Sequence, residues 1–320
     1  MAQQPLVVEF WDVGQGDCSV IHLPSGEIIL IDVGPRGNPI SGWLISHGNI
    51  RVHSIVLTHN DADHIGALNA VVDGARSRIG TVYFLEDRSR KDDVFVRLVR
   101  RLDTAKKCGE VTNIRRLEAP RVLWSDSNSG SSLEVKFPPV LSNIMAPSAN
   151  ETAGVLSLSI HSAVKILWAS DTTIENVAAQ CQGSRPEYLV GPHHGAPADR
   201  GDKRALAWLK SVSPRKVVVS VGSGNDYKHP QVNYIRDVRT SGGAVVCTQL
   251  TPRCENKRKL RDVIKSHARL GLPQPNSGFT CRGPIRLTLE GGDFVSNDTL
   301  DVEHAVSILK LKSPRCVEPF

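Results

Sequence analysis

The chain has 320 residues, of which 40% are hydrophobic and 22% charged, and its formal net charge is +6. This length suits one large domain or two smaller ones, and no apolar run approaches the roughly 18 to 20 residues of a membrane span. The modest positive charge is compatible with a polyanionic substrate such as nucleic acid.

Two further features bear on where the protein works. Seven scattered cysteines do not resemble the disulfide framework of a short secreted chain. Residues 1–5 lack the basic and apolar regions of a signal peptide. We therefore expect a cytoplasmic protein without a membrane span.

In the first third of the chain, short apolar runs separated by turn residues predict strands. The expected strands are residues 6–11, a hairpin of 18–23 and 27–31, then 55–57 and 81–85. Helices are expected over residues 65–68 and 92–107.

The remainder of the chain continues the alternation of strands and helices. Residues 125–132 read as a polar loop. The expected strands are 133–140, 155–160, 165–169, 187–190, 217–221 and 244–248, with a helix over 202–211. We see no internal repeat and no linker, so the pattern predicts a layered α/β sandwich in a single domain spanning residues 1–320.

The most informative segment is Thr58-His59-Asn60-Asp61-Ala62-Asp63-His64, which directly follows the apolar run 54–57. Imidazole and carboxylate groups together suit zinc, manganese or iron. A turn and a helix N-cap would account for Asn60 and the aspartates, but not for two flanking histidines. The segment therefore predicts two ligand pairs facing two neighbouring metal ions.

Later strands of the series also end in candidate ligands. The strand 165–169 leads to Asp171, and the strand 187–190 leads to His193 and His194. The strand 217–221 leads through the glycine-containing loop 222–225 to His229. Because loops at strand ends commonly carry chemistry, this order predicts one constellation rather than isolated residues.

Taken together, these motifs resemble the metallo-β-lactamase-fold hydrolases. More narrowly, they resemble the nuclease-type domain of the ComEC DNA-uptake (competence) proteins and its stand-alone relatives. The matching segments are 12–17, 31–34, 58–64, Asn150 to Ser157, 170–171, 192–195 and 229–230. The resemblance covers residues 7 to 230 and implies a four-layer αββα sandwich.

The resemblance also implies roles for individual residues. His59 and Asp61 would hold one ion, Asp63 and His64 the second, with Asp171 bridging both and His229 completing the second site. Asp12 and Asp32 would orient histidine ligands from behind. His193 or His194 would lie near the substrate phosphate, and the sequence leaves open which.

The chain departs from the broader family at two positions. Most members carry histidine where Asp61 stands, and a further histidine ligand before the bridging aspartate. The histidine available there, His161, would lie roughly 25 Å from Asp171 along the hairpin. Asn150 is the better candidate, directly or through water. This oxygen-rich set favours manganese over zinc.

The expected chemistry is hydrolysis of a phosphodiester, with DNA as the substrate. Two ions about 3.5–4 Å apart would lower the pKa of a bridging water and stabilise the transition state. Asp63 or Asp171 would accept a proton, His194 or His229 would act on the leaving side, and the amides of 222–225 could bind a phosphate. The alternatives are a hydrolase of small nucleotides or other phosphoesters, and a metal-stabilised binding subunit without turnover.

A helical basic insertion is expected at about 253–283, either as a nucleic-acid contact or as solvated surface. Cys247, Cys254 and Cys281 flank this helix and His267 lies within it. These four residues could hold a structural zinc ion, although buried thiols without metal are the commoner outcome. Cys18, Cys108, Cys181 and Cys316 read as packing or surface residues.

Overall fold

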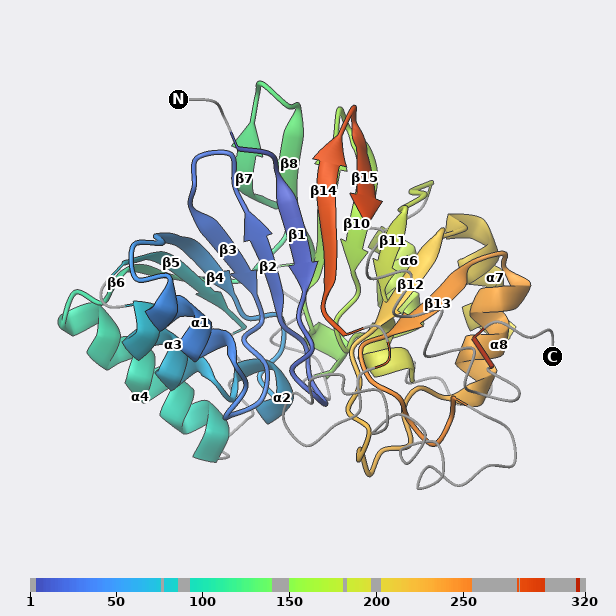
Figure 1. The fold of residues 1–320 in the computed structure, drawn as a ribbon, viewed down its shortest axis with the longest axis horizontal. Coiled ribbons are helices and arrows are strands. Elements are labelled where there is room, and N and C mark those ends of the chain that lie inside the picture. The colour runs from blue at the N-terminus through green and yellow to red at the C-terminus, as the bar shows by residue number, and fades with distance from the viewer. Residues whose placement is uncertain are drawn as a thin grey trace.

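Two mixed sheets face each other in the computed structural model, and helices cover their outer faces (Figure 1). The structure describes residues 4–75, 78–85, 93–139, 150–180, 183–196, 203–254, 281, 283–296 and 315–316. Most of the expected basic insertion, including His267, lies outside these residues, as does Cys181. In the part of the chain that is described, no helix is long and apolar enough to cross a membrane.

The first sheet has eight strands in the order β15-β14-β1-β2-β3-β4-β5-β6. Its strands are β1 Val7–Phe10, β2 Ser19–His22, β3 Ile28–Ile31, β4 Val52–Val56, β5 Ile79–Phe84, β6 Val111–Arg116, β14 Ile285–Glu290 and β15 Asp293–Ser296. The strands β3 to β6 run parallel, and the remaining pairs are antiparallel.

The second sheet has seven strands in the order β13-β12-β11-β10-β9-β8-β7. Its strands are β7 Arg121–Asp126, β8 Ser131–Phe137, β9 Val155–Ile160, β10 Ala163–Trp168, β11 Tyr188–Val190, β12 Lys216–Val219 and β13 Ala244–Cys247. Here the strands β10 to β13 are the parallel set.

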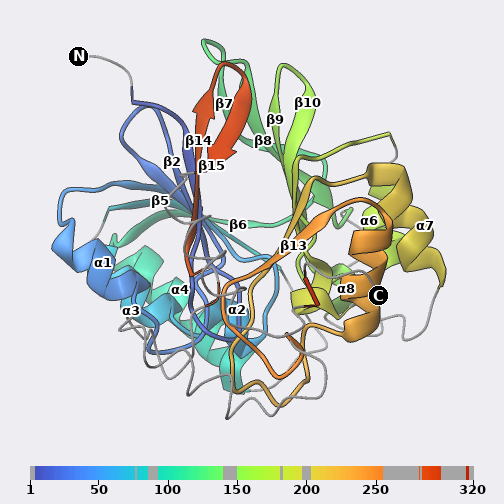
Figure 2. The ribbon, with the colours of Figure 1, turned by 45° about the vertical axis from the view of Figure 1, so that its right-hand side comes forward.

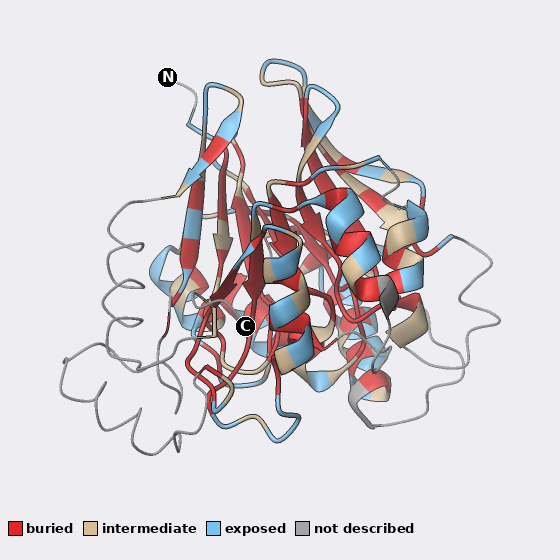
Figure 3. Cartoon of the chain, turned by 90° about the vertical axis from the view of Figure 1, so that its right-hand side faces the viewer, coloured by how far each residue is buried: buried red, intermediate tan, exposed pale blue. Residues whose placement is uncertain are grey.

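Helices form the two outer layers (Figure 2). On the first sheet lie α1 Ile40–Ser46, α3 Leu68–Ala75 and α4 Asp93–Lys107. On the second sheet lie α6 Ile174–Gln180, α7 Lys203–Val212 and α8 Val232–Thr240. These helices bury one face and leave the other to solvent, as amphipathic helices do (Figure 3).

Alternation of side chains along the strands divides the interior into three cores. In β3, Ile29 and Ile31 face the second sheet, whereas Ile28 and Leu30 face the helices. A third core lies between the second sheet and its own helices. Each fully buried aliphatic side chain contributes about 1.5–3 kcal/mol, so both faces of each sheet are stabilised. The expectation of a four-layer αββα sandwich is confirmed.

The structure also departs from the expected elements. The sequence did not predict the edge strand β6, the strand β7, the β14–β15 hairpin or the helices α1, α6 and α8. The expected loop 125–132 is shorter, because β7 continues to Asp126 and β8 begins at Ser131. The β9–β10 hairpin has its turn at His161, at the opposite end of the hairpin from Asp171, as the sequence indicated.

Candidate metal centre

The predicted ligands follow the carboxyl ends of parallel strands in both sheets. After β4 comes the segment 58–64, whose short helix α2 spans Ala62–Ile65. Asp171 follows β10, and the 3-10 turn η2 (Pro192–Gly195) with His193 and His194 follows β11. His229 lies beyond β12. Because parallel strands of one sheet end at the same edge, these loops meet there.

The backbone around this edge is strained at several non-glycine residues. Asp32, Ser170, His193 and His194 have φ values of 55°, 47°, 48° and 52°. Such left-handed conformations cost of order 1–3 kcal/mol each and persist only where the surroundings enforce them. Their concentration around the histidines and aspartates is typical of a functional site.

At the centre lie four buried residues whose ligand atoms are all within 4.8 Å of one another: Asp17, His64, Asp171 and His194. His64 Nε2 is 3.3 Å from Asp171 Oδ1. His194 Nε2 is 3.8 Å from the same oxygen, and His194 Nδ1 is 3.8 Å from Asp17 Oδ1. We refer to these four residues as the central cluster.

The other candidate ligands surround the central cluster. Asp63 Oδ2 is 3.2 Å from His194 Nε2, and the His59 ring lies 5.1 Å from the His64 ring. Asp61 Oδ2 is 3.6 Å from His59 Nδ1.

Two histidines complete the surroundings on the side of the second sheet. His193 Nε2 is 3.8 Å from Asp171 Oδ2, and the His229 ring lies 5.4 Å from the His193 ring. The structure thus gathers His59, Asp61, Asp63, His64, Asp171, His193, His194 and His229, but not the further candidate Asn150.

Asp32 fixes His64 from behind. Its carboxylate accepts hydrogen bonds from Thr58 N at 2.7 Å, from Thr58 Oγ1 at 2.5 Å and from His64 Nδ1 at 2.8 Å. The bond to Nδ1 leaves Nε2 of His64 facing Asp171. A carboxylate behind a histidine in this way fixes the ring and its tautomer for metal binding.

Asp12 and Asn150 have different surroundings from those expected. Asp12 accepts a hydrogen bond from Gln249 Nε2 at 2.7 Å and from Gly14 N at 3.3 Å, not from a histidine. Asn150 begins the 3-10 turn η1 (Asn150–Thr152), where its carbonyl accepts from Ala153 N. Within the described residues, no side-chain hydrogen bond joins it to the central cluster.

The loop 222–225 positions His229, and two of its backbone amides are already engaged in hydrogen bonds. Gly222 N donates to Gln15 Oε1 and Ser223 N donates to Gln249 Oε1, so these two amides are not open to a phosphate. The Asn225 carboxamide accepts from His229 N at 2.8 Å and donates to its carbonyl at 3.1 Å. Asn225 therefore positions His229.

Buried groups of opposite charge determine the electrostatics of the site. Burial lowers the pKa of His64, but Asp171 and Asp32 outweigh burial and hold it well above its usual value. In the same way, burial lowers the pKa of His194, but the charges of Asp171 and Asp17 outweigh burial and raise this pKa to about 9.

His229 shows the opposite behaviour. Burial, together with the neighbouring rings of His194 and His193, lowers the pKa of His229 to about 4. Its imidazole is therefore neutral at pH 7 and offers a lone pair to a metal ion.

Unpaired buried atoms show that the site fits a divalent cation. His59 Nε2 and His229 Nδ1 are buried without a hydrogen-bond partner, whereas His64 Nε2 and Asp171 Oδ1 face only each other, as an ion pair at 3.3 Å. Such atoms cost about 1–3 kcal/mol each unless something else satisfies them. Imidazole nitrogens and carboxylate oxygens converging in this way suit a divalent metal site.

The sequence interpretation did not assign a role to Asp17, although the motif 12–17 was recognised. Asp17 N donates to the carbonyl of Asp63 at 3.2 Å, which places the Asp17 carboxylate beside His194. The close approach requires Gly16, since a Cβ there would lie 2.2 Å from Asp63 O. A glycine immediately before an aspartate in a recognised motif was the available signal.

Comparison with known proteins identifies the domain. Residues 11–136 match the model of the metallo-beta-lactamase superfamily. Over these residues, the chain is similar to metallo-β-lactamase superfamily domains. This similarity, with the central cluster at the ends of the strands, supports a metal-dependent hydrolase.

Individual relatives of this metallo-β-lactamase domain are distant. The competence protein ComA of Neisseria gonorrhoeae is 26% identical over 250 residues, which cover 76% of this chain and 31% of ComA. The chain thus spans about a third of the length of that relative.

Two solved structures resemble the domain. A metallo hydrolase from the archaeon Ignicoccus hospitalis has a TM-score of 0.47 and 16% identity over 75% of this chain and 94% of its own. Unliganded yeast PDE1 has a TM-score of 0.43 and 12% identity over 76% and 97% of the two chains.

Proposed function

We propose that the chain is a metal-dependent phosphodiesterase that cleaves DNA. Two divalent ions would be held by His59, Asp61, Asp63, His64, Asp171 and His229, and the oxygen-rich set favours Mn²⁺ over Zn²⁺. When bound, such ions supply Lewis-acid stabilisation and a water of lowered pKa. The observation that carries the proposal is the buried set of converging histidine and aspartate atoms, beside a cavity to which Arg36 and Arg97 contribute.

The two adjacent histidines of η2 differ in exposure, and this difference suggests their roles. The His194 side chain is 1% exposed and donates from Nδ1 to Ser220 O at 3.0 Å, so its Nε2 faces Asp63 and Asp171. The His193 side chain is 28% exposed. We therefore assign His193 to the substrate phosphate or leaving group, and His194 to the ordering of the central cluster.

We assign Asp63, as an ionised carboxylate, to accept a proton from the attacking water. Burial raises the pKa of Asp63, but the hydrogen bond from His194 and the charge of His64 lower it to about 2, so its carboxylate is ionised at pH 7.

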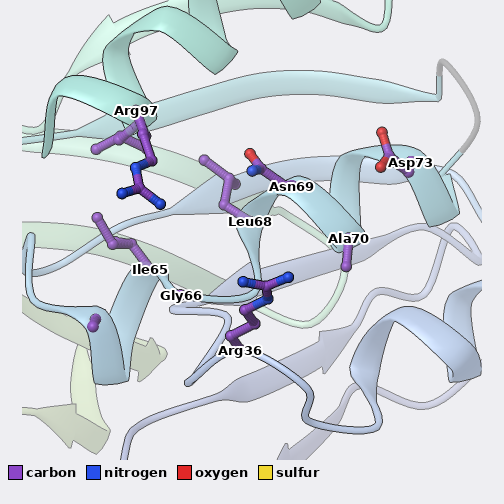
Figure 4. A pocket seen from close by; sticks show the side chains of 10 residues that line it. Arg36, Ile65, Gly66, Leu68, Asn69, Ala70, Asp73 and Arg97 are labelled. Atoms are coloured by element: carbon purple, nitrogen blue, oxygen red, sulfur yellow. The ribbon is translucent and has the colours of Figure 1, made fainter. Parts of the chain in front are cut away.

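A cavity next to the site carries two arginines that suit a polyanionic substrate. This cavity of about 440 Å³ has a mostly apolar lining from α2, α3 and α4, to which Arg36, Arg97 and Asp73 add charge. Figure 4 shows the Arg36 and Arg97 side chains extending towards the cavity from opposite sides. Arginine binds phosphates through paired N–H donors, so this arginine groove suits a nucleic-acid backbone leading away from the ligands on α2.

An exposed aromatic ring stands at the margin of the site. Tyr227 is 69% exposed, and its ring lies 5.7 Å from the His229 ring. Stacking on such rings contributes about 1–3 kcal/mol per base in proteins that bind single strands. Tyr227 therefore supports a substrate that presents a base next to the scissile phosphate.

The direct test is manganese-dependent cleavage of labelled DNA, with bis(p-nitrophenyl) phosphate as a generic small diester. Wild type should cleave DNA, His59→Ala and Asp171→Asn should abolish cleavage, and His47→Ala should behave as wild type because His47 is exposed on α1's C-terminal side. Hydrolysis of the small diester without DNA cleavage would favour a small-phosphoester hydrolase. Metal binding without turnover of either compound would favour a binding subunit.

A further inference from the structure

Four cysteines far apart in the sequence gather at the end of β13, and none of them belongs to the central cluster. Cys247 ends β13, Cys254 closes the turn after it, Cys281 precedes β14, and Cys316 lies near the C-terminus. Cys254 and Cys281 pack in one small buried cluster with Leu250. Cys316 packs against the hydrophobic cluster that contains Cys247.

Backbone hydrogen bonds connect the segments that carry these residues. Cys281 N donates to Thr248 O at 3.0 Å, next to Cys247, and Arg315 N donates to Cys254 O at 3.0 Å, next to Cys316. Thr251 N also donates to Cys254 Sγ at 3.2 Å. An N–H group directed at a cysteine sulfur stabilises negative charge on that sulfur, as a thiolate ligand requires.

We infer that Cys247, Cys254, Cys281 and Cys316 form a structural zinc site that fastens the residues around 254, 281 and 316 to the end of β13. The site is separate from the proposed function and does not depend on it. Zinc is the ion expected for a set of four thiolates, since such soft ligands select it and a structural site has four protein ligands.

The immediate environment of the sulfurs fits this inference. Cys247 is buried, and Cys254 and Cys316 lie close enough to act on it electrostatically. The described cysteines form no disulfide with one another.

In this structure the four cysteine sulfurs lie farther apart than the ligands of a closed zinc site. Over the described ranges, ligand atoms lie within 4.8 Å of one another only in the central cluster, whereas the sulfurs of a closed site lie about 3.8 Å apart at a Zn–S distance of about 2.3 Å. Zinc would therefore draw the four segments together. Cys316, which the sequence interpretation treated as packing or surface, replaces His267 as the fourth ligand.

The site has a structural consequence for the metal centre. Gln249 lies between Cys247 and Cys254, and its carboxamide donates to Asp12 and accepts from Ser223 N. A closed zinc site on both sides of Gln249 would hold this link between the loops 12–17 and 222–225.

The test is cobalt substitution of the full chain, prepared reduced, with zinc measured by mass spectrometry before exchange. Wild type should show thiolate-to-cobalt charge-transfer absorption for one equivalent of metal per chain, and Asp171→Asn should show the same. Cys316→Ser should lose this absorption and one equivalent of zinc. Cys316→His should retain the metal with weaker absorption, which separates loss of a ligand from loss of the fold.

Cys108→Ser is the matched control, because Cys108 is exposed beyond the end of α4. It should leave zinc content and absorption unchanged. The inference is overturned if wild type lacks the thiolate absorption, if Cys316→Ser keeps it in full, or if the native chain contains disulfides among these cysteines. If wild type shows the thiolate-to-cobalt absorption but does not cleave DNA, only the proposed function is contradicted.

Discussion

The Asp17 carboxylate is buried beside the histidines of the central cluster. Its oxygen lies 3.8 Å from His194 Nδ1, and burial raises the pKa of Asp17 despite the opposing charges of His194 and His64. A carboxylate that close to the candidate ligands contributes negative charge to whatever cation binds there. Its backbone bond to Asp63 also couples the two loops.

Replacement of Asp17 by asparagine keeps its shape and removes its charge. We expect Asp17→Asn to weaken divalent-metal binding by about 10–100-fold, the range for residues that support metal ligands. Isothermal titration with Mn²⁺ measures the change. Asp103→Asn, on the exposed face of α4, should bind the metal as wild type does, and equal affinity in both variants would contradict the role of Asp17.

At the scale of elements, the loop 12–17 reaches the site only because glycine is at position 16. Gly16 has φ +141°, and a Cβ there would lie 2.2 Å from Asp63 O and 2.8 Å from Pro35 Cδ. Gly14 also has positive φ, but nothing lies within 4 Å of its Cβ position. A side chain at position 14 would therefore meet backbone strain alone, whereas a side chain at position 16 would also clash with neighbouring atoms.

The two alanine variants should therefore differ in stability. Gly14→Ala should cost about 1–2 kcal/mol from its left-handed backbone, and Gly16→Ala about 3 kcal/mol or more, since a clash with backbone adds to strain. Urea unfolding gives both free energies. If both variants lose the same free energy of unfolding, the backbone at Asp63 can move to accommodate a side chain at position 16, and the loop is not tightly packed.

The arginine groove is formed between the loop after β3 and the helix α4. A second cavity of about 420 Å³ continues it and adds Arg100 to Asn69 and Arg97. We expect Arg36→Ala with Arg97→Ala to raise KM for DNA at least about tenfold, to flatten its salt dependence, and to leave hydrolysis of the small diester unchanged.

Arg51→Ala is the control for the arginine groove. Arg51 precedes β4, at the edge of the sheet opposite the ligands, where it pairs with Glu27. Its KM for DNA should equal that of wild type. If the Arg36→Ala, Arg97→Ala double variant has the KM and salt dependence of wild type, the arginine groove does not bind the DNA substrate.

The sequence allowed the site-bearing elements to be predicted better than the edges of the sheets. The strand β4 was evident because an apolar run is followed directly by ligands. In contrast, β6 has four exposed residues of six and no apolar alternation. The strand β14 pairs with β1 from the other end of the chain, with Thr288 opposite Val7, and local patterns cannot reveal such a partner.

The residues of the site show the same division. His59, Asp61, Asp63 and His64 could be recognised because their side chains crowd one short segment. Asp17 could not, since its role depends on the close approach of two backbones at Gly16 and Asp63. Cys316 could not be recognised either, because it is far from Cys247 in the sequence and lies near it only in the folded structure.

At the scale of the whole molecule, the two sheets share one polar site at the edge where their parallel strands end. The central cluster takes Asp17 and His64 from the first sheet's loops and Asp171 and His194 from the second. Trp168 Nε1 also donates to Ser19 Oγ between the sheets. A cation bound to this cluster would therefore join the two halves of the sandwich.

Metal binding should accordingly stabilise the entire fold. At free metal one hundred times Kd, binding to the native state adds about 2.7 kcal/mol, which raises Tm. Calorimetry with Mn²⁺ and after chelation should show this shift in wild type but not in Asp171→Asn. An equal shift in the variant would place the stabilising metal elsewhere in the molecule.

The most direct measurement is anomalous diffraction from crystals of the full chain soaked in Mn²⁺. We expect two anomalous peaks among His59, Asp61, Asp63, His64, Asp171 and His229, and none at these positions in Asp171→Asn crystals. A soaked wild-type crystal without a peak at the central cluster, or with manganese bound only elsewhere, would contradict it.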